Sequence, residues 1–480
     1  MAKKEKKTEG SVHPNKIGIK EGMGYMLGDS GNLFVLTYVS SFLKMFYTDV
    51  LKIAPNKVAN LFLITRLWDA VNDPLWGNIV AKRRPGKDGK YRPYIKFIAI
   101  PVALAQLLCF IDISRFTDKD WVILAFAYVT YIAFGMLYTG INVPFGSLAS
   151  VITDDPDGRT LLSTFRSIGG GIGGAAPLLI APFIIYNKVQ NADGTTHDEV
   201  NANGMLSFAA VMAVCAIVFY FACYKSTKER VPSEANPQVN MRKIYAGMFK
   251  SRPFIVLALT GILISGQLQF ASLNQYLYKN YFCNTSLSVV GTIAQYLPMA
   301  IMIPFTPMLV KKFGKKELSG FGSFFSALAA IACFLLKPRP DQAWMFMVLL
   351  FIIGFGYSFV SITNWAVVAD VIDYQEYKTG IKTESAIYAV YTFCRKFGQT
   401  IADFGGLTLL SAVGYDVNIM ANAGYVEGVS EGILMICTLI PAVTYTLIFL
   451  LYKFAYPLTK EKLVPVYETV RKNNEEKAGA

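Results

Sequence analysis

Two carboxylates lie inside an apolar stretch near the start of the sequence. The segment LWDAVNDPLWG places Asp69 and Asp73 within residues 58–80, a run long enough to cross a bilayer, which takes about 20 residues. Four-residue spacing puts both carboxylates on one face of a helix. Because they repel each other, a cation or a shared proton between them would lower the cost of burying them. The alternative is a static ion pair with Arg66, although one arginine does not neutralise two aspartates.

A second group of polar residues lies inside other apolar stretches, interleaved with aromatic residues. Aromatic rings stack on the apolar face of a sugar while polar groups bind its hydroxyls, so this composition predicts a hydroxyl-rich ligand. The alternative is hydrogen bonding between helices, which would account for Gln399 and for the segment SGQLQFASLNQY (265–276). The group comprises Asp29, Asn142, Arg166, Thr392, Arg395, Lys396, Gln399 and Asp403, of which Lys396, Gln399 and Asp403 share one helical face.

The composition indicates a polytopic helical membrane protein, an all-α fold class. Of the 480 residues, 53% are hydrophobic and only 16% are charged, whereas soluble domains have about 25% charged residues. The net charge of +13 resides mainly in short connections, so we expect no nucleic-acid partner. The N-terminus has no apolar core typical of a cleaved signal peptide. The seven cysteines are scattered and both histidines, His13 and His197, lie outside the apolar runs, which argues against disulfides or a zinc site.

The apolar runs predict twelve transmembrane helices. Most Lys and Arg residues in the connections fall in one alternating set, which includes both termini, so the positive-inside rule predicts that this set is cytoplasmic. We expect Lys44 and Lys96, near span ends, to reach the membrane surface along their flexible stems. The predicted spans are residues 22–47, 57–80, 94–113, 121–150, 160–186, 204–224, 254–279, 286–310, 318–337, 342–369, 384–412 and 430–456.

The spans also divide into two halves. A basic, Gly-containing turn follows the second span (AKRRPGKDGKYRPY) and another follows the eighth (VKKFGKKELSG), as expected of a transporter built from two six-helix repeats. The predicted parts are an N-terminal bundle (1–224), a central cytoplasmic loop (225–253), a C-terminal bundle (254–456) and a cytoplasmic tail (457–480).

The sequence resembles the glycoside–pentoside–hexuronide:cation symporters of the major facilitator superfamily. Three blocks carry this resemblance: RLWDAVNDPLWG with GKYRPY, then YTGINVPFGSL, then VVADVIDYQEYKTGIKTES. The resemblance implies a cation site at Asp69, Asn72, Asp73 and Thr139, where Asp69 and Asp73 would be metal ligands only if the cation is sodium. It also implies a substrate site at Asp29, Tyr138, Asn142, Arg166, Thr392 and Lys396, and a cytoplasmic gate at Arg159, Asp370, Asp373 and Glu376. Solvated loop charge is the alternative for the gate residues.

Two positions depart from the member of this family that transports melibiose. Asn142 stands where that protein has an aspartate, and Gly146 stands where it has a tryptophan. The substrate positions therefore hold Asp29 against Arg166 and Lys396, which favours an acidic glycoside because an unpaired buried charge is costly. If Asp403 neutralises Lys396, a neutral pentoside or glucoside would be preferred instead.

We therefore expect a cation-coupled sugar symporter, driven by sodium or protons, in the cell membrane and functional as a monomer. No cofactor is expected other than the coupling cation. A catalytic constellation at a membrane face is missing from the sequence, so we expect no enzyme. A major facilitator transporter of a lysolipid or drug, or a membrane sensor that transports nothing, are the alternatives.

Overall fold

The protein is helical along nearly its whole described length. The computed structural model describes residues 17–153, 156–190, 196–230, 250–379, 384–420 and 423–478. The chain forms two compact units. Unit 1 comprises Met1–Leu43, Thr65–Ala181 and Ala202–Pro237, and unit 2 comprises Lys44–Ile64, Pro182–Asn201 and Gln238–Ala480. The four-part division expected from the sequence stays a prediction.

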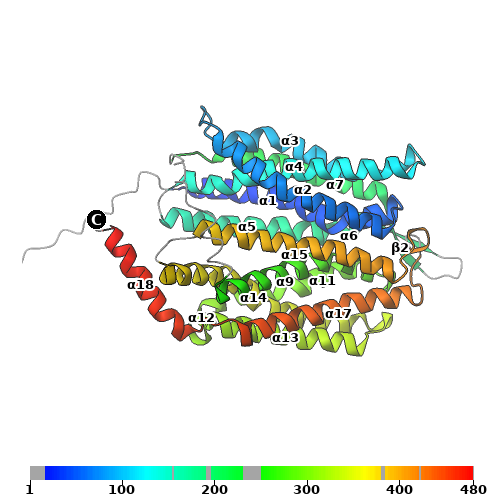
Figure 1. The fold of residues 1–480 in the computed structure, drawn as a ribbon. Coiled ribbons are helices and arrows are strands. Elements are labelled where there is room, and N and C mark those ends of the chain that lie inside the picture. Colours follow the sequence, from blue (N-terminus) through cyan, green and yellow to red (C-terminus); the bar gives the residue numbers. More distant parts are fainter. Residues whose placement is uncertain are drawn as a thin grey trace, which may run out of the picture. The chain divides into compact units, whose positions relative to one another are not determined.

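Unit 1 is a bundle of long apolar helices in which α3 packs against both α4 and α7. The last residues of α1 and the first turns of α2 cluster with unit 2 instead. The helices that contribute to unit 1 are α1 (Ile19–Met45), α2 (Pro55–Lys82), α3 (Arg92–Cys109), α4 (Asp120–Ile152), α5 (Pro156–Ile180) and α7 (Ala202–Ser226), as Figure 1 shows.

Unit 2 is built around α13 and α14, which pack against each other, and around α15 packed on α9. Its core contains Leu257, Val360, Val367 and Tyr391. Its helices are α6 (Pro182–Ile185), α9 (Arg252–Phe270), α10 (Asn274–Asn280), α11 (Leu287–Met302), α12 (Thr306–Phe313), α13 (Lys315–Leu336), α14 (Ala343–Thr379), α15 (Glu384–Ala412), α16 (Val417–Met420), α17 (Val429–Leu450) and α18 (Lys460–Ala478).

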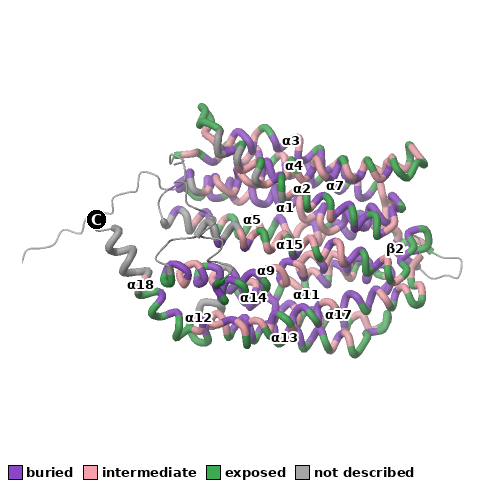
Figure 2. The backbone as a smooth tube through the Cα atoms, viewed as in Figure 1, coloured by how far each residue is buried: buried purple, intermediate pink, exposed green. Residues whose placement is uncertain are grey.

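Nine segments of the described chain are long and apolar enough to cross a membrane. Three further helices, α1, α2 and α15, have 27, 28 and 29 residues and carry the charged residues singled out above. Large apolar side chains such as Phe97, Val129, Val214 and Leu335 are exposed, and Figure 2 shows exposed positions recurring along many helices. This outward apolar surface is typical of a protein surrounded by lipid.

One connection departs from the expected all-α structure. Strands β1 (Tyr186–Gln190) and β2 (Thr196–Val200) form an antiparallel hairpin in which Lys188 pairs with Asp198. The hairpin is anchored within unit 2, because Oδ2 of Asp198 accepts hydrogen bonds from the backbone N–H of Thr285, at 2.6 Å, and from its hydroxyl, at 2.8 Å. The fold class is all-α as predicted, and this short hairpin is a detail that the sequence analysis did not predict.

Candidate cation and substrate sites

The two carboxylates of α2 face two positions of α4 with the same four-residue spacing. Oγ1 of Thr139 donates a hydrogen bond to Oδ1 of Asp73 at 3.1 Å. One turn earlier, a Cβ added to Gly135 would lie 3.0 Å from Oδ1 of Asp69, so glycine lets α4 approach that carboxylate closely. The small residue Gly140 similarly lies against the ring of Trp76. These contacts bring three of the four predicted cation residues together between α2 and α4.

Asn72, the fourth predicted cation residue, lies between the two aspartates in the sequence. Its side chain is 1% exposed, and its Nδ2 has no hydrogen-bond partner among the described residues. Arg66 lies 3.8 Å from Oδ2 of Asp69, which is longer than a charge-assisted hydrogen bond of about 2.7–2.9 Å. This contact alone is therefore a loose ion pair.

Glycines on α5 position the charged pair of the predicted substrate site. Gly169 and Gly173 face the backbone of α1, where an added Cβ would lie 2.3 Å from the carbonyl oxygen of Met26 and 2.8 Å from that of Ser30. This close approach places Nε of Arg166 3.3 Å from Oδ1 of Asp29. The Arg166 side chain is 44% exposed and that of Asp29 is 12% exposed, so the guanidinium is the more accessible member of the pair.

Aromatic rings of unit 1 lie beside this charged pair. The ring of Tyr25 stacks on that of Phe145 at 4.6 Å, and the Arg166 guanidinium lies 5.6 Å from the centre of the Phe145 ring. Tyr138, also on α4, stacks with Phe134 at 5.9 Å. Such rings next to hydrogen-bonding groups suit a sugar, as expected from the sequence.

The two positions that depart from the family pattern also lie on α4. A Cβ added to Gly146 would meet nothing within 4 Å. A side chain could therefore leave the backbone at this position without a clash at its first carbon. Asn142 is half-buried.

The remaining predicted substrate residues, Thr392 and Lys396, lie on α15 in unit 2. Oγ1 of Thr392 is buried and has no hydrogen-bond partner among the described residues, while Lys396 is half-buried. The neighbouring Arg395 donates a hydrogen bond to the hydroxyl of Ser265 at 3.0 Å. Arg395 thus has a structural partner on α9.

Asp403 has a different partner from the one considered in the sequence. Its Oδ1 lies 2.5 Å from Nζ of Lys44, which is 2% exposed, and accepts a hydrogen bond from Nε2 of Gln269 at 2.9 Å. The expectation that Lys44 reaches the membrane surface was therefore wrong, because a buried carboxylate holds its ammonium in the interior. Lys44 and Gln269 therefore both engage Oδ1 of the Asp403 carboxylate.

A second buried ion pair was missed by the sequence analysis. Asp49 and Lys279 form it, and each side chain is fully buried. Oδ1 of Asp49 also accepts hydrogen bonds from the hydroxyls of Tyr415, at 2.8 Å, and Thr48, at 2.7 Å. Both residues lie at the ends of apolar runs, where loop charge is common, so the sequence contained no signal for their burial.

The predicted gate residues lie near the end of α14. Oδ1 of Asp370 lies 2.5 Å from Nζ of Lys315 and accepts a hydrogen bond from the hydroxyl of Tyr467 on α18. Burial and this hydrogen bond raise the pKa of Tyr467, which keeps it a donor. Asp370 and Glu376 are both 2% exposed and Asp373 is half-buried, so the first two are not solvated loop charges. The Arg159 side chain lies outside the described residues.

Comparisons with known proteins bear on the family and the fold of the chain. Residues 24–460 match the model of the MFS/sugar transport protein family. The chain is 28% identical to a "Glucuronide carrier protein homolog" of Escherichia coli (92% of this chain, 93% of the relative) and 29% identical to an "Isoprimeverose transporter" of Lactiplantibacillus pentosus (85% and 83%). It resembles the crystal structure of a D-xylose-proton symporter with a TM-score of 0.61 at 14% identity, over 92% of this chain and 98% of that one. The predicted membrane-transporter fold is thereby confirmed, as is the expectation of a transporter rather than an enzyme.

Proposed function

Since the chain belongs to the MFS/sugar transport protein family, we propose that it is a symporter that couples inward movement of a sodium ion or proton to uptake of a glycoside. It would act as a monomer in the cell membrane with both termini in the cytoplasm. The register of α2 and α4, which sets Asp69 beside Gly135 and Asp73 beside Thr139, is the observation that carries this proposal.

The cation binds at the two carboxylates of α2. Carboxylate, amide and hydroxyl oxygens from Asp69, Asp73, Asn72 and Thr139 are ligands suited to a hard monovalent cation, and a proton shared by the carboxylates would serve equally. Among the described residues no group of three or more His, Cys, Asp or Glu side chains could hold a metal ion. A transported cation needs no such dedicated cage, because it must also be released.

The substrate is an acidic glycoside such as a hexuronide. Its positions carry two cationic side chains, Arg166 and Lys396, against the single carboxylate of Asp29. Asp403 does not correct this imbalance, since it is engaged by Lys44 and Gln269. The name of the glucuronide relative supports an anionic sugar, while the isoprimeverose relative keeps a neutral pentoside as the second candidate.

The buried ion pairs of unit 2 belong to the conformational part of the transport cycle. Lys44 and Asp49 come from the first half of the sequence, and they bind Asp403 and Lys279 from the second half. Alternating access moves the two halves of such transporters against each other. These pairs would then have to separate, and their charged groups would be rehydrated, each time the two halves move apart around them.

Uptake into proteoliposomes tests the coupling. Purified protein reconstituted with radiolabelled methyl glucuronide outside should accumulate it when an inward sodium or proton gradient is imposed, and only equilibrate it without one. Reciprocity requires that the sugar also tighten cation binding. Equal internal sugar with and without either gradient would show a uniporter, and binding without any uptake would show a sensor.

A further inference from the structure

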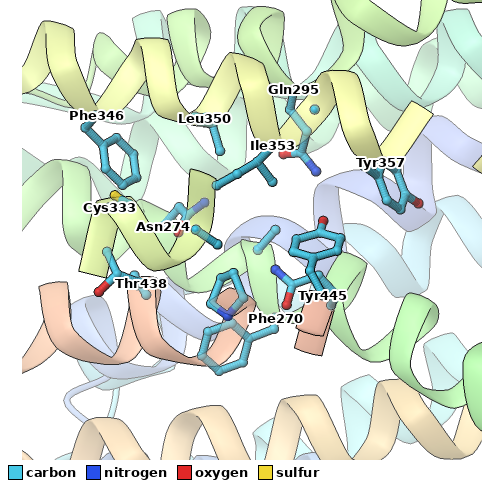
Figure 3. A pocket seen from close by; sticks show the side chains of 16 residues that line it. Phe270, Asn274, Gln295, Cys333, Phe346, Leu350, Ile353, Tyr357, Thr438 and Tyr445 are labelled. Carbon is cyan, nitrogen blue, oxygen red and sulfur yellow. The ribbon is translucent and has the colours of Figure 1, made fainter. Parts of the chain in front are cut away.

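A small cavity lies inside unit 2, apart from the residues discussed above. It has a volume of about 40 Å³ and is lined mainly by side chains of α9, α10, α11, α13, α14 and α17. Figure 3 shows the amides of Asn274 and Gln295 and the hydroxyls of Tyr445 and Thr438 among the aromatic and aliphatic side chains around this space. None of its sixteen lining residues is Asp, Glu, Lys or Arg.

One lining residue has an unmet hydrogen-bonding need. Gln267 is 9% exposed, and its Oε1 has no hydrogen-bond partner among the described residues. A buried polar atom left without a hydrogen-bond partner destabilises the folded protein. The sequence suggested that the amides of this segment bond to neighbouring helices, and for Oε1 of Gln267 the structure does not show such a bond.

We propose that the cavity is a binding site for a cluster of two or three ordered water molecules, one of which donates a hydrogen bond to Oε1 of Gln267. A water molecule needs about 10–15 Å³ of such volume and two to four polar partners, and the cavity meets both conditions. A sugar is several times too large. The lining has no carboxylate to bind a cation. An apolar ligand would leave Oε1 of Gln267 without a hydrogen-bond partner.

The position of Gln267 on α9 gives these waters a role in transport, and this step rests on the proposed function. Gln269, two residues further along α9, donates to Asp403, the partner of Lys44. When that ion pair separates, the carboxylate that Gln269 binds loses its cationic partner, and the hydrogen bonds of α9 must adjust. Water molecules in the cavity can exchange hydrogen-bond partners during this movement. An amide of Gln267 without water around it would have no such partners. The water site itself does not depend on which substrate is transported.

Hydroxyl-radical labelling tests the site directly. X-ray radiolysis generates hydroxyl radicals from bound water molecules. Buried side chains next to an ordered water are therefore oxidised faster than buried side chains without one. Cys333 and Cys437 line the cavity, and Cys223 is equally buried elsewhere. In the full-length protein in nanodiscs, Cys333 and Cys437 should be oxidised several times faster than Cys223. Equal rates for all three would overturn the proposal.

The sign of a stability change provides a second, independent test. Gln267→Met removes the amide at nearly constant volume. If waters satisfy the amide, the melting temperature should fall. If the cavity contains no water, the melting temperature should stay the same or rise, and this result would overturn the proposal. Gln275→Met is the matched control, because Oε1 of Gln275 is likewise buried without a partner but does not line the cavity; its melting temperature should not fall. Neither readout involves transport, so the water site can fail while the symporter proposal stands.

Discussion

Lys44 and Asp403 form a buried ion pair although they come from opposite halves of the sequence. Nζ of Lys44, in the last turn of α1, lies 2.5 Å from Oδ1 of Asp403 in the middle of α15, and the two side chains are 2% and 0% exposed. The hydroxyl of Ser272 accepts a further hydrogen bond from Lys44 at 2.6 Å. The carboxylate sits two helical turns beyond Lys396, so the pair fixes the helix that carries part of the predicted substrate site.

Breaking this pair from one side should destabilise the protein more than removing it altogether. Lys44→Met and Asp403→Leu each leave an uncompensated buried charge, which costs about 3–5 kcal/mol. The double variant replaces the pair with apolar side chains and should recover most of the melting temperature. Thermal unfolding in detergent measures all three.

The exposed pair of Arg115 and Asp112 provides the control for this experiment. Its atoms lie 2.8 Å apart, but the arginine side chain is 51% exposed, and exposed pairs contribute only about 0–1 kcal/mol. Arg115→Met should therefore hardly change the melting temperature. If Lys44→Met behaves in the same way, the ion pair is not a major contributor to the stability of the protein.

Neutralising either carboxylate of α2 should abolish uphill transport. Asp69→Asn and Asp73→Asn keep the size of the side chain but remove the charge that attracts the cation. We expect sugar accumulation against a gradient to be lost, while binding or exchange of sugar survives better. Uptake and counterflow in proteoliposomes distinguish the two activities.

Asp112→Asn, a change in a loop carboxylate, should leave accumulation intact and serves as the control. Thr139→Val should weaken cation affinity without abolishing coupling, because it removes one hydroxyl and no charge. An Asp73→Asn protein that still concentrates sugar would make this carboxylate structural.

The charged residues of the predicted substrate site should each contribute to affinity. Asp29→Ala, Arg166→Ala and Lys396→Ala each remove a charged hydrogen bond worth roughly 1.5–3 kcal/mol, which corresponds to tenfold or more in the dissociation constant. Arg395→Ala is the control next to Lys396, because Arg395 bonds to Ser265; it should affect affinity less. Unchanged binding in all three variants would place the substrate elsewhere.

Membrane orientation can be tested at two exposed lysines. Lys188 lies on β1 and Lys250 at the end of the central loop. In a background without the seven native cysteines, an impermeant maleimide added to intact cells should label Lys188→Cys but not Lys250→Cys. The opposite pattern would reverse the topology, since the Lys and Arg bias of the connections predicts a cytoplasmic central loop.

The sequence could suggest a cation site because the spacing of its two carboxylates is local. Asp69 and Asp73 share a face of α2 by helical periodicity alone, and the motif on α4 supplied Thr139. The pairing of Lys44 with Asp403 depends instead on how distant helices pack, and a lysine near a span end is expected at the surface. Periodicity places both residues on helices, but it contains no information about this contact.

The sequence analysis did not predict the hairpin for a different reason. The stretch from Tyr186 to Val200 contains an Asp-Gly pair between two short runs, which is a known turn signal. That signal could have predicted the strands. The burial of Asp49 had no such indicator, because its partners Lys279 and Tyr415 come from other elements.

The charge of the substrate is the last prediction. With Asp403 held by Lys44 and Gln269, the substrate positions keep two cationic side chains and one carboxylate, so a ligand carboxylate would complete the balance. Methyl glucuronide should therefore inhibit uptake of a labelled glycoside at lower concentration than methyl glucoside, which has the same ring without the charge. The preference should shrink in Lys396→Gln, where the two cations are reduced to one. Equal inhibition by both sugars in the unmodified protein would refute the charge argument and favour a neutral pentoside, and the open space at Gly146 would then be the main determinant of specificity.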